Sequence, residues 1–142
     1  MKTIIFLTLM FAFEVAFSQA GENTTLTVVV ENIRSNNGVV LAGLYTHKTF
    51  MKTDAEFGSS SGKIDNGVVT LVFENVPAGT YGLSVLHDEN SNGRMDFDAS
   101  GMPQEDYGIS NNIFNPYGPP RWEDARFEVE VPEMELMVRL GR

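Results

Sequence analysis

The chain contains no cysteine, and this absence removes several kinds of structure and chemistry at once. It excludes disulfide bonds, a thiol nucleophile and a lipid-modified N-terminal cysteine. A domain without disulfides is stabilised by core packing, or by a ligand such as a metal ion that binds only the folded state. Because 42% of the 142 residues are hydrophobic, we expect one domain with a packed core.

Basic residues are also scarce, with 10 Lys and Arg against 19 Asp and Glu and a formal net charge of −9. Nucleic-acid binding requires a basic surface that contacts phosphates, so we expect no nucleic-acid partner. Long apolar stretches are missing as well. The apolar run at residues 4–13 is shorter than the roughly 20 residues that span a bilayer.

This short apolar run predicts a secretory signal peptide at residues 1–18. Lys2 precedes it, and Ala16-Phe17-Ser18 supplies the small-x-small pattern of a cleavage site. The mature domain would then comprise residues 19–142. An uncleaved membrane anchor is the alternative, which the shortness of the run disfavours. We therefore expect an exported protein, periplasmic or extracellular, without a transmembrane segment after signal cleavage.

Residues 25–33 alternate between apolar and polar side chains, which is typical of a β-strand. Similar patterns predict strands at 39–45, 63–65, 68–73, 81–87, 125–131 and 134–140. Asn-Gly pairs at 37–38 and 66–67 predict hairpin turns, the first of them between strands 25–33 and 39–45. Residues 53–57 predict one short helical turn, with Thr53 as its cap.

About seven short strands without crossover helices predict an all-β fold, an antiparallel β-sandwich, with a small barrel as the alternative. Residues 88–121 have no sustained periodicity and are predicted as one long loop. Loops of this length in compact domains are usually functional or disordered. The aromatic residues in this segment favour an ordered, functional loop.

The start of this loop predicts a calcium site. Four short side chains that carry oxygen alternate around a glycine: Asp88, Asn90, Asn92 and Asp96. Calcium takes six to eight oxygen ligands, and Gly93 and the Arg94 carbonyl suit the same loop pattern. Ala99 stands where an EF-hand has its closing glutamate, which excludes a true EF-hand.

A hybrid calcium site would be completed from elsewhere in the chain, by Glu105, Asp106 or Asp124. The alternative interpretation is that the Asp and Asn side chains form Asx-turns with their own backbone. The sequence pattern leaves both interpretations open.

Two histidines define a second candidate site. His47 and His87, together with Asp88, have the residue types for a softer ion such as zinc or copper, and a metal-dependent hydrolase centred on His87 and Asp88 would use Glu105 as its acid. A catalytic zinc needs a third ligand that the spacing does not supply. No Gly-x-Ser-x-Gly motif surrounds Ser110, which disfavours a serine hydrolase.

Aromatic and amide side chains form a third candidate, a ligand-binding surface. Its residues are His87, Tyr107, Asn111, Asn112, Tyr117 and Trp122. Such a surface suits an extended peptide or a sugar, and Tyr107, Tyr117 and Trp122 are the candidates for carbohydrate binding. The alternative is that the rings attach the long loop to the sandwich while the amides satisfy its backbone.

Several short motifs together resemble one protein family. They comprise Pro-Ala-Gly-Thr-Tyr at 77–81, His-Asp-Glu-Asn with Asn-Gly and Asp at 87–96, Tyr-Gly-Ile-Ser-Asn-Asn at 107–112, Gly-Pro-Pro at 118–120 and Glu-Asp-Ala at 123–125. The chain resembles the exported bacterial domain-of-unknown-function family 2141 (DUF2141) over essentially its whole mature length. This resemblance implies an immunoglobulin-like or transthyretin-like sandwich behind a signal peptide, and it implies no established activity.

We therefore expect a non-enzymatic binding or structural module of the cell envelope, with a loop stabilised by Ca²⁺. Its partner would be another envelope protein, a peptide or a glycan.

Overall fold

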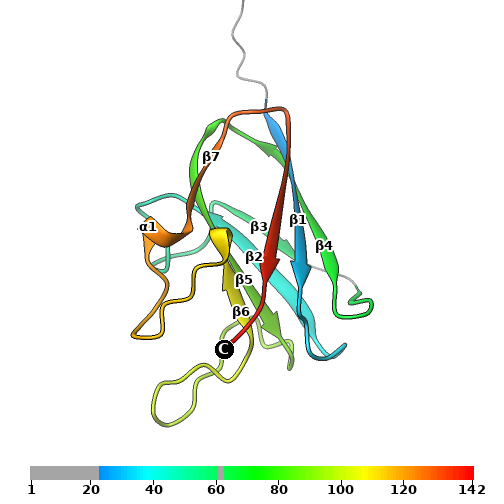
Figure 1. Ribbon diagram of the computed structural model, residues 1–142, viewed down its shortest axis with the longest axis vertical. Coiled ribbons are helices and arrows are strands. Elements are labelled where there is room, and N and C mark those ends of the chain that lie inside the picture. Colours follow the sequence, from blue (N-terminus) through cyan, green and yellow to red (C-terminus); the bar gives the residue numbers. More distant parts are fainter. Residues whose placement is uncertain (1–22, 61–62) are drawn as a thin grey trace, which may run out of the picture.

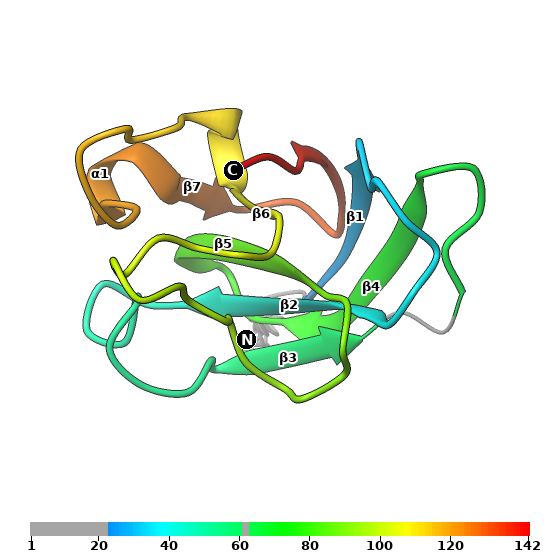
Figure 2. The ribbon, with the colours of Figure 1, turned by 90° about the horizontal axis from the view of Figure 1, so that it is seen from below.

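The computed structural model describes residues 23–60 and 63–142. The predicted signal peptide at 1–18 lies outside these residues. Two β-sheets pack face to face, as the two views in Figure 1 and Figure 2 show. The prediction of an all-β sandwich is therefore confirmed. In the described part of the chain, no helix combines the length and the apolar character needed to cross a bilayer.

The smaller sheet has the strand order β4 (Val69–Val76), β1 (Thr24–Glu31) and β8 (Glu133–Arg139). Alternation along β1 buries Leu26, Val28 and Val30 completely, as the sequence predicts. The β1–β4 pair is antiparallel, whereas β1 and β8 are parallel. The sandwich is thus antiparallel as the sequence predicted, except for this one strand pair.

The larger sheet has the order β3 (Phe57–Ser60), β2 (Val39–Tyr45) and β5 (Gly79–Asp88). Two short strands then share one edge of β5. β7 (Arg126–Val129) pairs with its first half, and β6 (Tyr107–Ile109) pairs with its second half. Every second side chain of β5, from Tyr81 to His87, is buried, which agrees with the predicted face.

The predicted hairpin between the first two strands is wrong, because β1 and β2 belong to different sheets. The Asn37-Gly38 turn instead carries the chain from one sheet to the other. Gly38 has a φ of +68° and packs against the end of β5, where a Cβ would lie 2.0 Å from the Asp88 carbonyl oxygen. An Asn-Gly pair specifies a local reversal of the chain, but the burial of apolar faces decides which strands become neighbours.

Two other local predictions need correction. The segment 63–65 forms only a bridge between Asp65 and Val68, around a confirmed turn in which Asn66 and Gly67 have positive φ. The helical turn expected at 53–57 is absent, and β3 begins at Phe57. The chain turns earlier, at residues 47–52. Burial of Phe50, which is 4% exposed, accounts for the position of that turn.

The predicted loop at 88–121 is interrupted by regular structure. β6 and the 3₁₀ turn η1 (Ser110–Asn112) divide it into loops at 89–106 and 113–121, and the short helix α1 (Trp122–Ala125) begins directly after the second loop. Tyr107 and Gly141 exchange two backbone hydrogen bonds of 2.9 and 3.0 Å. This bridge connects the larger sheet to the segment that follows β8, so the two sheets are linked by hydrogen bonds at one corner of the sandwich.

Candidate functional site

Asp88 organises the first turn of the 89–106 loop. Its side chain is buried, and its Oδ1 and Oδ2 accept hydrogen bonds from the backbone N–H groups of Asn92 and Gly93 at 3.0 and 2.7 Å. Gly93 has a φ of +81°, a conformation that glycine adopts without strain. The carboxylate of Asp88 therefore holds the loop in a tight turn.

Three side chains of this turn meet at one place. The Asn90 amide nitrogen donates to Asp96 Oδ2 at 2.6 Å, and the Asn92 amide nitrogen donates to both Asp96 oxygens at 2.9 and 3.0 Å. Asn92 Oδ1 accepts from the Arg94 N–H at 3.0 Å. Three of the candidate calcium residues, Asn90, Asn92 and Asp96, therefore hydrogen-bond to one another. Asn90 Oδ1 also accepts from the Asn92 N–H at 3.1 Å, so both asparagines form the Asx-turns of the alternative interpretation.

Glu105 closes the loop from its far end. This buried carboxylate accepts hydrogen bonds from the backbone N–H of Glu89 at 2.9 Å and of Asp96 at 3.1 Å. Asp124 lies elsewhere, where it pairs with Arg121 at 2.7 Å. Of the three carboxylates predicted to complete a hybrid site, Glu105 is the one with a hydrogen bond to the loop.

Asp106 is 1% exposed and lies between two arginines. Arg34 Nε is 3.2 Å from its Oδ2, and Arg142 Nε is 3.6 Å from its Oδ1. Arg142 also donates to the Gln104 carbonyl oxygen. Sequence reasoning missed both arginines, because they are far from residue 106 in the chain and no motif surrounds them.

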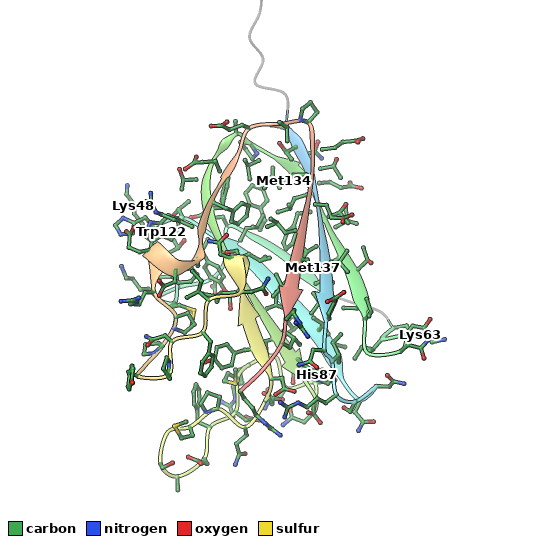
Figure 3. All side chains as sticks on the ribbon, in the orientation of Figure 1. Lys48, Lys63, His87, Trp122, Met134 and Met137 are labelled. Carbon is green, nitrogen blue, oxygen red and sulfur yellow. The ribbon has the colours of Figure 1, made fainter. Side chains whose placement is uncertain are left out.

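His87 is fully buried, and Figure 3 shows it near the lower end of the sandwich. Its Nε2 lies 2.9 Å from the Asn37 carbonyl oxygen, so this nitrogen carries the proton. Within the described residues its Nδ1 has no hydrogen-bond partner, and it is 4.0 Å from Glu89 Oε1. Because neighbouring strand residues point to opposite faces, His87 and Asp88 leave β5 in opposite directions.

His47 belongs to a different part of the molecule. Its ring lies 5.3 Å from that of Trp122, and Trp122 also packs on Phe50 at 5.8 Å. His47 follows the end of β2 that pairs with Gly82, whereas His87 pairs with Val40 at the other end. The two histidines are therefore not brought together. Among the described residues, no three His, Asp or Glu side chains form a group that would hold a metal ion.

The predicted aromatic and amide surface is divided by the structure. Asn111 donates to the carbonyl oxygens of Asp124 and Arg126, both at 3.0 Å. Asn112 donates to the Met137 carbonyl oxygen at 2.9 Å. These amides attach η1 to the rest of the fold, as the alternative interpretation of the sequence proposed.

The rings of the predicted surface also separate into groups. Tyr107 lies beside Phe114, with ring centroids 6.3 Å apart, whereas Trp122 packs with His47 and Phe50. Tyr117 is 97% exposed at the tip of the 113–121 loop. The three rings proposed for carbohydrate binding are thus not part of one aromatic cluster.

The Ser110 side chain has a structural role. Its buried hydroxyl accepts from the Leu83 N–H at 3.0 Å and donates to the Ala125 carbonyl oxygen. The side chain therefore connects η1 to both β5 and α1. Both hydrogen bonds of the Ser110 hydroxyl are therefore made with the backbone.

Comparison with known protein families finds a match. The family model described as "Uncharacterized protein conserved in bacteria (DUF2141)" matches residues 28–136, which is most of the chain and nearly all of the sandwich. Comparison with curated proteins finds no match, and neither does comparison with solved structures. The matched range includes the larger sheet, most of the smaller sheet, the 89–106 loop and η1. The chain therefore belongs to the bacterial family DUF2141.

Proposed function

We propose that this protein is an exported, non-enzymatic binding or structural module of the cell envelope, and that its 89–106 loop is stabilised by Ca²⁺. Export rests on the sequence of residues 1–18, with its basic start, apolar run and small-x-small ending. The calcium proposal rests on the convergence of Asn90, Asn92 and Asp96 in a loop that two buried carboxylates already shape.

The spacing of the three side chains suits a hard cation. Their polar atoms are 2.6–3.0 Å apart. Neighbouring oxygens around an ion at about 2.4 Å are separated by roughly 3 Å. Rotation of the two amide groups by 180° would turn their oxygens toward the position between them and Asp96. It would break the hydrogen bonds that these oxygens accept from the Asn92 and Arg94 N–H groups, and coordination of the ion would have to offset that loss. Calcium would then replace the amide hydrogens as the partner of the carboxylate.

The surrounding contacts limit how far the loop has to move for this exchange. Asp88 and Glu105 together hold four backbone N–H groups, those of residues 89, 92, 93 and 96. Their oxygens retain further lone pairs, so either carboxylate is able to add a ligand without releasing the backbone. A loop ordered before binding loses less entropy when the ion arrives.

Thermal melting with Ca²⁺ and with a chelator tests the calcium proposal. At a free Ca²⁺ concentration of 100 times the dissociation constant, we expect the free energy of unfolding to rise by about 2.7 kcal/mol. Asp96→Asn removes the carboxylate at the convergence point and should abolish the rise. Asp98→Asn is the matched control, because the Asp98 carboxylate accepts hydrogen bonds from Ser100 and Met102 in a neighbouring turn.

Identical melting curves with Ca²⁺ and with chelator would contradict the calcium proposal, as would an unchanged response in Asp96→Asn. Asp88→Ala is a weaker test, because it removes two backbone hydrogen bonds whether or not calcium binds.

Export is tested separately by the intact mass of the protein in a periplasmic or extracellular fraction. We expect the chain to begin at Gln19, and retention of residues 1–18 would contradict cleavage there.

A further inference from the structure

An open hollow of about 210 Å³ lies where β6 meets the chain after β8. Its lining comes from β6, from η1 and the residues that follow it, and from the last residues of the chain. Gly108 makes this junction close, because a Cβ at this position would lie 2.7 Å from Val138 Cγ1 and 2.9 Å from the Arg139 carbonyl oxygen. The hollow thus depends on contact between segments that are about 30 residues apart.

Apolar side chains form one side of the hollow. Tyr107 and Phe114 line it with their rings tilted by 37° to each other, and Ile113 lines it beside them. Phe114 is 57% exposed and Ile113 is 47% exposed, so both have apolar surface left to bury. Burial raises the pKa of Tyr107 above its ordinary value of 10.0. A phenol is protonated at neutral pH even at that ordinary value, so Tyr107 is a hydrogen-bond donor there.

Positive charge gathers on the other side. Arg139 and Arg142 line the hollow, and Arg142 is held by Asp106, which also binds Arg34. Arg139 has no ion-pair partner among the described residues. Together with Glu31, which is paired in register with Arg139 on β1, these side chains comprise three guanidinium groups and two carboxylates. Their sum is positive, whereas the whole chain has a formal net charge of −9. The arginines around the hollow therefore attract an anion, although the net negative charge of the protein repels anions elsewhere.

We propose that this hollow binds a small organic carboxylate, whose apolar body packs on Tyr107 and Phe114 and whose carboxylate binds Arg139. Arginine and aromatic side chains are the residue types that contribute most to binding at protein surfaces. The volume is below the 300–1,000 Å³ typical of sites for drug-sized ligands, so the ligand is the size of one aromatic side chain. The same chemistry is offered by a free aromatic acid and by the C-terminal residue of a peptide.

Titration of ¹⁵N-labelled protein with phenylacetate, monitored by NMR, tests this proposal. We expect saturable shifts of the backbone amides of Tyr107, Gly108, Phe114 and Gly141. Phenylacetamide has the same ring without the charge and should cause no saturable shift there. Because a hydrogen bond to a charged group contributes about 1.5–3 kcal/mol, Arg139→Gln should weaken phenylacetate binding by about tenfold or more.

Arg126→Gln is the matched control, since Arg126 is also an exposed arginine but pairs with Glu123 outside the hollow. It should leave the dissociation constant of phenylacetate unchanged. Phe114→Ala removes an apolar wall and should weaken binding without altering the charge. Equal shifts with phenylacetate and phenylacetamide, or unchanged phenylacetate binding in Arg139→Gln, would overturn the proposal.

The tripeptide Gly-Gly-Phe, with a free or an amidated C-terminus, distinguishes the two sources of the carboxylate. Binding of the free tripeptide more tightly than phenylacetate supports a site for the end of a peptide chain, and weaker binding supports a site for a free acid. Equal binding of the free and amidated tripeptides would overturn the role of the carboxylate. These measurements do not depend on calcium, so the carboxylate proposal and the calcium proposal are tested independently.

Discussion

Glu105 and Asp96 are joined by a hydrogen bond of 3.1 Å, in which the Glu105 Oε2 accepts from the Asp96 backbone N–H. The other oxygen of the same carboxylate accepts from the Glu89 N–H at 2.9 Å. A single buried side chain therefore fastens both ends of the turn that contains the candidate calcium residues. The geometry of that turn depends on a residue that follows it in the sequence.

Glu105→Gln should destabilise the protein by about 1–3 kcal/mol. A glutamine has only one acceptor oxygen, so one of the two backbone N–H groups would face an amide nitrogen and lose its partner in a buried place. Urea denaturation followed by circular dichroism measures the change. Glu74→Gln, on the exposed side of β4, is the control and should change the stability by no more than about 0.5 kcal/mol. Equal effects of the two substitutions would refute this role of Glu105.

Gly108→Ala should destabilise the protein by about 1–3 kcal/mol, because the added methyl group would overlap Val138 and the backbone at Arg139. The same substitution should displace β6 from the chain that leaves β8. Chemical denaturation measures the loss. Gly58→Ala on β3 meets no atom within 4 Å, and it should leave the midpoint of unfolding nearly unchanged. A stable Gly108→Ala protein would show that the sheets are less closely joined at this corner.

Asp98 provides a prediction about pH. Hydrogen bonds from the Ser100 side chain, and then from the backbone N–H groups of Met102 and Ser100, lower the pKa of Asp98 below its ordinary value of 3.8. The ionised form is the one favoured by folding. Its stabilising contribution is therefore present above pH 3.8 and is lost as the pH falls through the lowered pKa.

Carboxyl ¹³C titration by NMR measures this pKa directly. The midpoint for Asp98 should lie below 3.8 in the native protein, and Ser100→Ala should raise it because the largest of these interactions is removed. Ser35→Ala, which alters a hydroxyl in another loop, should leave the midpoint where it is. A midpoint at or above 3.8 in the unaltered protein would contradict the hydrogen-bonded turn.

Local pattern and tertiary structure contributed differently to the fold. The alternation of Leu26, Val28 and Val30 correctly predicted a strand and its buried face, because period-two burial is a property of the strand itself. The Asn37-Gly38 turn was predicted to close a hairpin, yet it connects two sheets. Which strand lies beside β1 depends on β4 and β8, and the latter begins about 100 residues later in the sequence.

The candidate sites show the same division. The spacing of oxygen-bearing side chains at 88–96 predicted a tight turn around Gly93, since alternate positions of such a turn lie close together. In the structure Asn90, Asn92 and Asp96 hydrogen-bond to one another. Asp88 instead binds the backbone of the same turn. Glu105 was one of three carboxylates that the sequence offered, and only the fold distinguishes it. The hollow beside Tyr107 was not predictable, because Phe114, Arg139 and Arg142 have no common motif.

By itself, the sequence determined an all-β domain, its inward-facing residues and an oxygen-rich turn, since these depend on neighbours within about ten residues. It also indicated the family, through several short motifs taken together. Tertiary structure decided the pairing of β1 with β8, the separation of His47 from His87, and the placement of Asp106 between Arg34 and Arg142. Those outcomes depend on which apolar faces bury one another most completely. That is a property of the whole chain, because each apolar face is buried by segments that lie far away in the sequence.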